Sequence, residues 1–179
     1  MSDDREDRLT RLFDEHAAAV RRYVRRRHAG EDTDDLVAEV FVVAWRKIDE
    51  IPDEAELPWL YRTAWNVLAN QQRKPLAVVV AEVPERADEV DVADQVIEDL
   101  ALASAWTQLS GRDREVLRLA AWEGLDGPAL AEALGIGVGG AAAALSRARA
   151  RLAEAYRAAT AEDRATGSGS SARSPLPAT

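Results

Sequence analysis

Residues 128–138 read Pro-Ala-Leu-Ala-Glu-Ala-Leu-Gly-Ile-Gly-Val, and this stretch decides the fold of the C-terminal half. Pro128 is favoured in the first turn of a helix, and Gly135 is favoured just after a helix ends. The apolar residues between them have helical spacing, and a second helix is expected after the turn at Ile136 and Gly137. A short helix, a glycine-containing turn and a second helix form a helix-turn-helix, whose second helix enters the DNA major groove in proteins that bind DNA.

Two other interpretations of this stretch were weighed. A helix, a turn and a helix also form αα-corners in helical bundles that never contact DNA. Residues 135–140 match the pattern G-x-G-x-x-G, but a dinucleotide site needs a preceding strand and a βαβ unit, whereas a helix precedes this one. We therefore favour DNA binding over a bundle corner, and both over a nucleotide site.

The rest of the C-terminal half is predicted to be helical as well. Apolar periodicity indicates a helix over residues 96–109, and a capping box at residues 110–113 begins another that ends at Gly124. A long helix follows from residue 138. Its cations, which suit contact with phosphates, are Arg147, Arg149 and Arg151.

The N-terminal half shows three amphipathic helices, over residues 9–29, 32–48 and 58–74. Gly30 ends the first helix and Pro75 ends the third. Residues 76–95 are acidic and contain no aromatic residue, which is typical of a flexible connector. The sequence therefore predicts an all-α protein of two small helical domains.

The composition narrows the class of function. The chain has 179 residues and a net charge of −9, of which residues 76–100 carry −7, so basic faces remain available elsewhere. It has two histidines and no cysteine, which excludes disulfides and thiolate chemistry and disfavours an enzyme. No apolar run reaches the length of a membrane span, and the charged N-terminus does not resemble a secretory signal.

Three polar or aromatic features allow alternative interpretations. Asp34, Asp35 and Glu39 lie on one helical face without a histidine in phase, which favours a solvated or protein-binding face over catalysis. The arginines at 21–27 form either a solvated face or a contact with a polyanion or partner. Trp59, at a loop–helix junction, is predicted to be the most exposed of the tryptophans.

Several segments resemble motifs of extracytoplasmic-function (ECF) sigma factors, in the same order along residues 9–158. Residues 35–46 (DLVAEVFVVAWR) resemble the polymerase-binding helix of that family. Residues 58–66 (PWLYRTAWN) and the pair 73–74 resemble its promoter −10 segment. The −35-binding domain is similar to residues 109–119 and 146–152.

The resemblance implies an organisation and a function. It implies a sigma domain 2-like unit of three to four helices at residues 1–75, the acidic linker 76–95, a sigma domain 4-like helix-turn-helix unit at residues 96–160, and a disordered tail at 161–179. Such a protein is a cytoplasmic transcription initiation factor without an active site or cofactor. Its partners are core RNA polymerase, bound at the β′ clamp helices, promoter DNA, and in some members an anti-sigma factor.

The resemblance also implies site residues. Those facing polymerase are Asp34, Asp35, Glu39, Val42 and Arg46. Those facing −10 DNA are Trp59, Arg62, Asn66, Asn70, Arg73 and Lys74, beside a base-capturing loop at residues 49–57. Those of the −35 contact are Arg118, Gly137, Gly140, Ala141, Ala142, Ala144, Arg147, Arg149 and Arg151.

One segment departs from the family pattern. Residues 137–144 read Gly-Val-Gly-Gly-Ala-Ala-Ala-Ala, where the family has Ser-x-Gly-Thr-Val-Lys-Ser-Arg. The polar side chains that read bases are replaced, so we expect phosphate contacts to dominate. Two alternatives stay open: a sigma-like adaptor that binds polymerase or an anti-sigma factor without selecting promoters, and a stand-alone helix-turn-helix regulator, which the three N-terminal helices disfavour.

Overall fold

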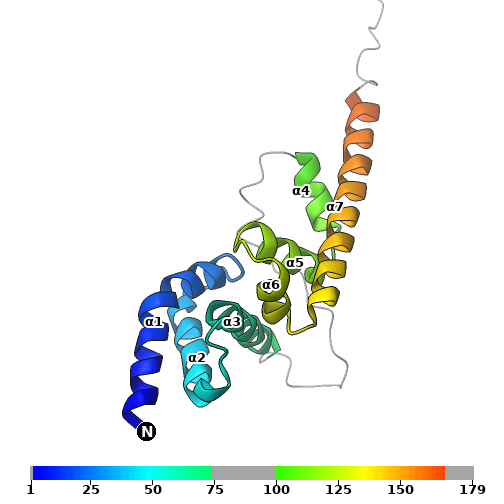
Figure 1. Ribbon diagram of the computed structural model, residues 1–179. Helices are drawn as coiled ribbons and strands as arrows, with labels where there is room; N and C mark the ends of the chain where they lie inside the picture. Colours follow the sequence, from blue (N-terminus) through cyan, green and yellow to red (C-terminus); the bar gives the residue numbers. More distant parts are fainter. Residues whose placement is uncertain (1, 74–99, 168–179) are drawn as a thin grey trace, which may run out of the picture.

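The computed structural model describes residues 2–73 and 100–167, which form seven α-helices, one short 3-10 helix and no strand (Figure 1). This confirms the predicted all-α class. Lys74, the acidic linker 76–95 and the last part of the predicted tail lie outside the described residues.

The N-terminal helices are α1 (Ser2–Arg25), α2 (Thr33–Arg46), the 3-10 helix η1 (Ile48–Glu50) and α3 (Glu56–Arg73). The three α-helices pack against one another in all three pairings. Each contributes the apolar stripe that its periodicity predicted, with Leu12, Val40 and Leu60 fully buried among them. The helix ends differ from the predicted ones. For example, α3 begins two residues before Pro58, where its start was predicted.

The C-terminal helices are α4 (Leu100–Thr107), α5 (Gly111–Ala121), α6 (Gly127–Leu134) and α7 (Val138–Gly167). Ser110 caps α5, because its Oγ accepts a hydrogen bond of 3.1 Å from the backbone N–H of Asp113. Gly135 ends α6 in the left-handed region, at φ +65°, which favours glycine. The helix-turn-helix is therefore formed by α6 and α7.

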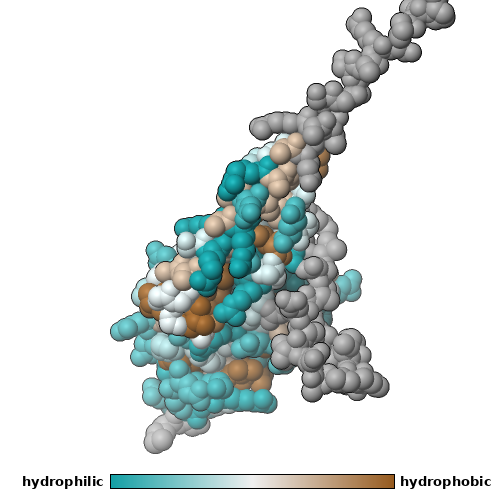
Figure 2. Space-filling model, turned by 90° about the vertical axis from the view of Figure 1, so that its right-hand side faces the viewer, coloured by the Kyte–Doolittle hydropathy of each residue, from teal (hydrophilic) through white to brown (hydrophobic). Residues whose placement is uncertain are grey.

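The predicted tail begins too early in the sequence. Helix α7 continues to Gly167, so residues 161–167 are helical and not part of a disordered segment. Figure 2 shows hydrophilic and more apolar residues alternating along this helix toward its C-terminal end. Residues 161–165 read Ala-Glu-Asp-Arg-Ala, and alanine, glutamate and arginine have high helix propensity, which favours extension of the helix.

The two halves share the larger of two hydrophobic clusters. This cluster contains side chains of α1, α2 and α3 together with Leu119, Leu130, Ala131 and Ala141 from the C-terminal half. The N-terminal and C-terminal halves of the chain meet in this cluster where α6 packs on α3 (Figure 1). The smaller cluster lies within the C-terminal half, between α4, α5 and α7.

Across the described ranges, no single helix combines the length and the apolar composition of a membrane span. The pair α6 and α7 meets that composition only when the two are taken together, across a bend of 89°.

Candidate polymerase and nucleic-acid interfaces

The candidate polymerase-binding residues lie on one exposed face of α2. Spacings of four, three and four residues bring to that face Asp35, Glu39, Val42 and Arg46, all of which are exposed. Val42 has an exposed fraction of 48%, which is large for a branched apolar side chain. The opposite face of α2 is buried in the shared cluster. Asp34 is exposed beside this face and pairs with Arg21 of α1 at 3.0 Å.

The candidate −10 residues form a second stripe, on α3. Arg62, Asn66 and Asn70 are separated by four residues each, so they share a face of α3, and Arg73 is the last residue of that helix. Asn66 and Asn70 are exposed. Arg62 is half-buried, because its Nη2 pairs with Glu132 Oε1 of α6 at 2.9 Å.

The prediction that Trp59 is exposed is wrong. Trp59 has an exposed fraction of 4% and belongs to the shared cluster. Because α3 begins at Glu56, Trp59 lies inside the helix and not at its junction with the loop. It is in phase with Thr63 and Val67, which are also buried. Trp59 therefore supports the −10 face from beneath and offers no stacking surface for a base.

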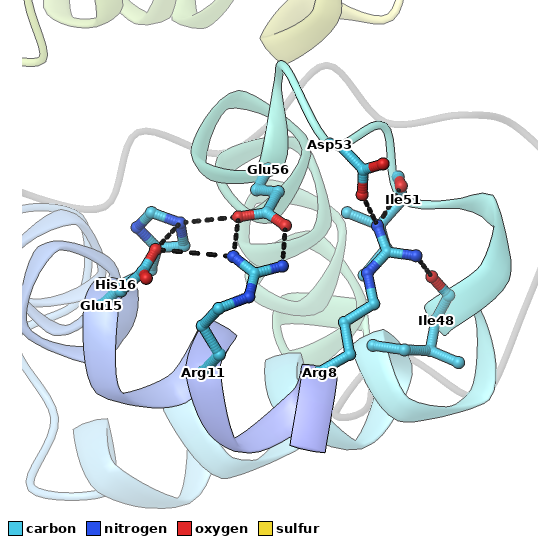
Figure 3. A network of polar contacts seen from close by, with 8 residues as sticks. All are labelled: Arg8, Arg11, Glu15, His16, Ile48, Ile51, Asp53 and Glu56. Atoms are coloured by element: carbon cyan, nitrogen blue, oxygen red, sulfur yellow. Dashed lines mark hydrogen bonds and ion pairs between the residues drawn. The ribbon is translucent and has the colours of Figure 1, made fainter. Parts of the chain in front are cut away.

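The loop that precedes α3 is held by α1 (Figure 3). The guanidinium of Arg8 donates to the carbonyl oxygens of Ile48 at 2.9 Å and Ile51 at 2.6 Å, and to Asp53 Oδ1 at 2.6 Å. A single side chain thus fixes both the backbone and a carboxylate of the acidic segment. No local pattern in the sequence indicates this role of Arg8, because it depends on how the loop folds back on α1.

Next to it, Arg11 binds the buried carboxylate of Glu56 through two hydrogen bonds of 2.8 and 3.1 Å (Figure 3). His16 Nε2 lies 3.3 Å from the same carboxylate. The hydrogen bond from Arg11 lowers the pKa of Glu56 below its ordinary value, against the opposing effect of burial, and His16 acts in the same direction. Glu15, His16 and Glu56 bring their polar atoms within 4.8 Å of one another, but Arg11 already pairs with both carboxylates, at 2.8 and 3.6 Å.

The candidate −35 residues of α7 divide into exposed and packed positions. The exposed ones are Gly137, Gly140, Ala142, Arg147 and Arg149. Ala144 is half-buried and packs against the smaller cluster. Ala141 has an exposed fraction of 1%, so its predicted contact with DNA is wrong. The reason is that residue 141 lies on the face of α7 that packs into the shared cluster.

Two further arginines of the predicted −35 set are engaged within the protein. Arg151 donates two hydrogen bonds to Asp113, at 2.7 and 2.9 Å, although its side chain is still 56% exposed. The prediction that Arg118 faces DNA is wrong, since only 7% of it is exposed. Its guanidinium lies 5.3 and 5.9 Å from the ring centres of Trp106 and Trp122. Burial lowers the pKa of Arg118 to about 10, and the charge of Arg27 contributes to that shift.

The arginine run of α1 reaches across to the C-terminal half. Arg27 Nε donates to Glu115 Oε2 at 2.8 Å, and the hydroxyl of Tyr23 donates to Glu115 Oε1 at 2.7 Å. Arg26 binds both oxygens of Glu123, at 2.5 and 2.7 Å. The run is therefore neither a simple solvated face nor, at these two positions, an exposed surface for a polyanion.

This polar junction is buried, and burial and neighbouring charges shift the pKa values of some of its groups. The side chains of Arg27 and Glu115 are only 3% and 4% exposed. Burial alone would lower the pKa of Arg27, but the charges of Tyr23 and Glu115 raise it above its ordinary value. Burial and the charge of Glu123 raise the pKa of Tyr61 to about 12. Arg27 thus stays cationic and Tyr61 stays protonated at neutral pH.

Comparison with known proteins gives the same assignment for both halves. The family description Sigma-70 region 2 matches residues 12–75, and Sigma-70 region 4 matches residues 99–152. The ECF RNA polymerase sigma factor SigL of Mycobacterium tuberculosis is 32% identical over 136 residues, covering 70% of this chain and 75% of SigL. The RNA polymerase sigma factor CnrH of Cupriavidus metallidurans is 28% identical over 120 residues, covering 59% of this chain and 63% of that protein.

Solved structures agree with the fold. A structure of CnrH in complex with the cytosolic domain of CnrY superposes with a TM-score of 0.54 at 27% identity, covering 84% of this chain and 88% of that one. The sigma factor RpoE of Bartonella quintana, solved with the anti-sigma factor NepR, gives a TM-score of 0.50 at 22% identity, covering 88% and 98%. With both sigma regions matched in order and a relative above 30% identity, the chain belongs to the ECF family of RNA polymerase sigma factors.

Proposed function

We propose that this protein binds core RNA polymerase through the exposed face of α2 and directs it to promoters. The observation that carries the proposal is the stripe of Asp35, Glu39, Val42 and Arg46. This stripe combines the exposed apolar side chain of Val42 with charged side chains of both signs, and the opposite face of the same helix is buried. Such a mixture is typical of a protein-binding surface, where an apolar anchor is surrounded by polar residues. The β′ clamp helices are the proposed partner, and the cytoplasm is the proposed location.

The proposal assigns −10 DNA to the stripe of α3. Asn66 and Asn70 carry amide groups that donate and accept hydrogen bonds, Arg62 on the same face adds positive charge, and Arg73 adds a further cation at the end of the helix. Single-stranded DNA needs such a combination of backbone cations and base contacts. The segment at residues 49–57 is the proposed pocket edge for an extruded base, held in shape by Arg8 and Arg11.

The proposal assigns −35 DNA to α7, with little reading of bases. The exposed positions at the start of the helix are Gly137, Gly140 and Ala142, and none has a side chain that donates or accepts. Specific contacts in the major groove need such groups, at about 1–3 kcal/mol for each good pair. Arg147 and Arg149 remain for phosphates, which give affinity without sequence information. Promoter choice is therefore expected to depend mainly on the −10 element.

Regulation by an anti-sigma factor is a further part of the proposal. Two structural neighbours, CnrH with CnrY and RpoE with NepR, were solved as complexes. We expect a comparable partner to cover the α2 face, since that is the surface polymerase needs. No catalytic role is proposed.

The test is capture of core RNA polymerase by the full chain. Reversing two charges, Asp35→Lys with Glu39→Lys, should weaken capture about tenfold or more, because two exposed acids of the α2 face change sign. The matched control, Asp7→Lys with Asp14→Lys, reverses two exposed acids on α1 and should leave capture unchanged. Equal capture by both double variants, each folded by circular dichroism, would refute the proposed polymerase surface.

A further inference from the structure

The last turn of α3 carries one end of the proposed −10 face, which consists of Arg62, Asn66 and Asn70. Asn70 is exposed, and the next residue, Gln71, is half-buried. The side-chain amide of Gln71 donates to Asp32 Oδ2 at 3.2 Å. The terminal turn of a helix frays unless a contact outside the helix holds it. Asp32 supplies such a contact at the end of α3, directly beside Asn70.

Asp32 does not cap the helix that it precedes. It occupies the N-cap position of α2, where an aspartate normally accepts a hydrogen bond from a backbone N–H of the first turn. Its side chain makes no such bond. Both of its oxygens face other side chains, since Oδ1 lies 2.5 Å from His28 Nε2 and Oδ2 accepts from Gln71. The hydrogen bond with His28 lowers the pKa of Asp32 against the opposing effect of burial, and the bond from Gln71 acts in the same direction as His28.

The absence of a side chain at Gly30 leaves room for these contacts. A Cβ placed on Gly30 would lie under 3.0 Å from both His28 Nε2 and Asp32 Oδ1. Any residue other than glycine would therefore push the histidine and the carboxylate apart. The four residues His28, Gly30, Asp32 and Gln71 thus form one unit, the Asp32 bridge, which joins the segment between α1 and α2 to the end of α3.

We propose that the Asp32 bridge positions the −10 face of α3, with Asp32 acting on Asn70 through Gln71. The segment before α3 is held from α1 by Arg8 and Arg11, and the bridge holds the opposite end of the helix. Both ends of the −10 face are then ordered before DNA binds, which reduces the entropy lost on binding. The inference rests on the proposed function for the DNA contact, but the order of the helix end is measured without DNA.

The first experiment removes the carboxylate from the full chain. Asp32→Ala should speed hydrogen exchange of the backbone amides in the last turn of α3, because the turn loses its anchor. It should also weaken binding of a fluorescent random-sequence single-stranded DNA about fivefold, with capture of core polymerase unchanged. Asp32→Asn keeps an oxygen that accepts from Gln71 and should restore most of the binding. The matched control, Glu31→Ala, removes the exposed acid next to Asp32 and should alter none of these measurements.

Two further variants break the bridge at other points. Gly30→Ala places a Cβ against His28 and Asp32, whereas its control, Gly111→Ala, adds one where no atom lies within 4 Å. Gly30→Ala should reproduce the faster exchange and the weaker DNA binding, and the control should not. Gln71→Leu should do the same as Gly30→Ala. Combining it with Asp32→Ala should add no further loss, because the two changes remove the same contact.

Unchanged hydrogen exchange in Asp32→Ala, or faster exchange with unchanged DNA binding, would overturn the inference. An equal loss of polymerase capture would also overturn it, since the bridge would then support the whole N-terminal unit and not the −10 face. Asn66→Asp separates the inference from the proposed function, because Asn66 lies in the −10 face and outside the bridge. If Asn66→Asp binds the DNA as tightly as the wild type, the proposed −10 face is wrong, and the hydrogen exchange of Asp32→Ala alone decides whether the bridge orders the end of α3.

Discussion

The buried ion pair between Arg27 and Glu115 gives the sharpest test of how the two halves are joined. Arg27→Met keeps an unbranched apolar side chain but removes the guanidinium, whose carbon lies 3.6 Å from the centre of the Tyr23 ring, and so leaves the carboxylate of Glu115 without its cation. Both side chains are less than 5% exposed. Removing one partner of a buried pair costs about 3–5 kcal/mol of the free energy of unfolding, because the other charge stays buried.

That loss is a large share of the whole, since domains of this size have free energies of unfolding of about 5–15 kcal/mol. At roughly 2–4 °C for each kcal/mol, the melting temperature should fall by about 6–20 °C. The assay is urea unfolding followed by circular dichroism and by tryptophan fluorescence, with tryptophans present in both halves. Arg25→Met, at the exposed last residue of α1 two positions before Arg27, should change stability by less than about 0.5 kcal/mol. A cost below about 1 kcal/mol for Arg27→Met would show that the halves are not docked through this pair.

Four further predictions concern single side chains. The pKa of Glu56 is lowered in the folded state from its ordinary 4.5, so its stabilising effect is present above that pH and is lost as the pH falls through the lowered pKa. Glu56→Gln should cost about 1–2 kcal/mol at pH 7 and progressively less as the pH falls below 4.5 in urea titrations. Ser110→Ala should lower the free energy of unfolding by about 1 kcal/mol, because the cap of α5 is lost; an unchanged urea midpoint would contradict this. Ala142→Lys adds a cation at an exposed position of α7 and should tighten duplex DNA binding while steepening its dependence on salt by about one phosphate contact in a fluorescence titration. Ala144→Arg should instead destabilise the fold, because residue 144 packs against the smaller cluster.

The helices could be predicted because their signals are local. Apolar spacing placed the buried stripe of α2 and the exposed stripe opposite it, including Asp35 and Glu39. The cap at Ser110 and the left-handed Gly135 follow from residue types within a few positions of each helix end. The helix-turn-helix needed nothing beyond such signals.

The errors concern contacts between distant segments. Arg118 carries no local sign of burial, and it is buried because α5 packs against other helices. Ala141 is in phase with Leu145 and Ala148, so helical spacing indicated a packed face there, and only the family resemblance suggested DNA contact. The predicted exposure of Trp59 is wrong because α3 begins two residues earlier than its predicted start. The role of Arg27 depends on a carboxylate 88 positions away, which no periodicity can indicate.

The central claim is that this chain is an initiation factor, and transcription by the purified protein with core RNA polymerase tests it most directly. Fragments of the source genome would be transcribed with and without the protein, and the 5′ ends of the products mapped. We expect new start sites that share a −10 element and tolerate variation at −35, and that disappear with the Asp35→Lys, Glu39→Lys variant. Stable capture of core polymerase without any new start site would contradict the account and indicate an adaptor that binds polymerase without selecting promoters.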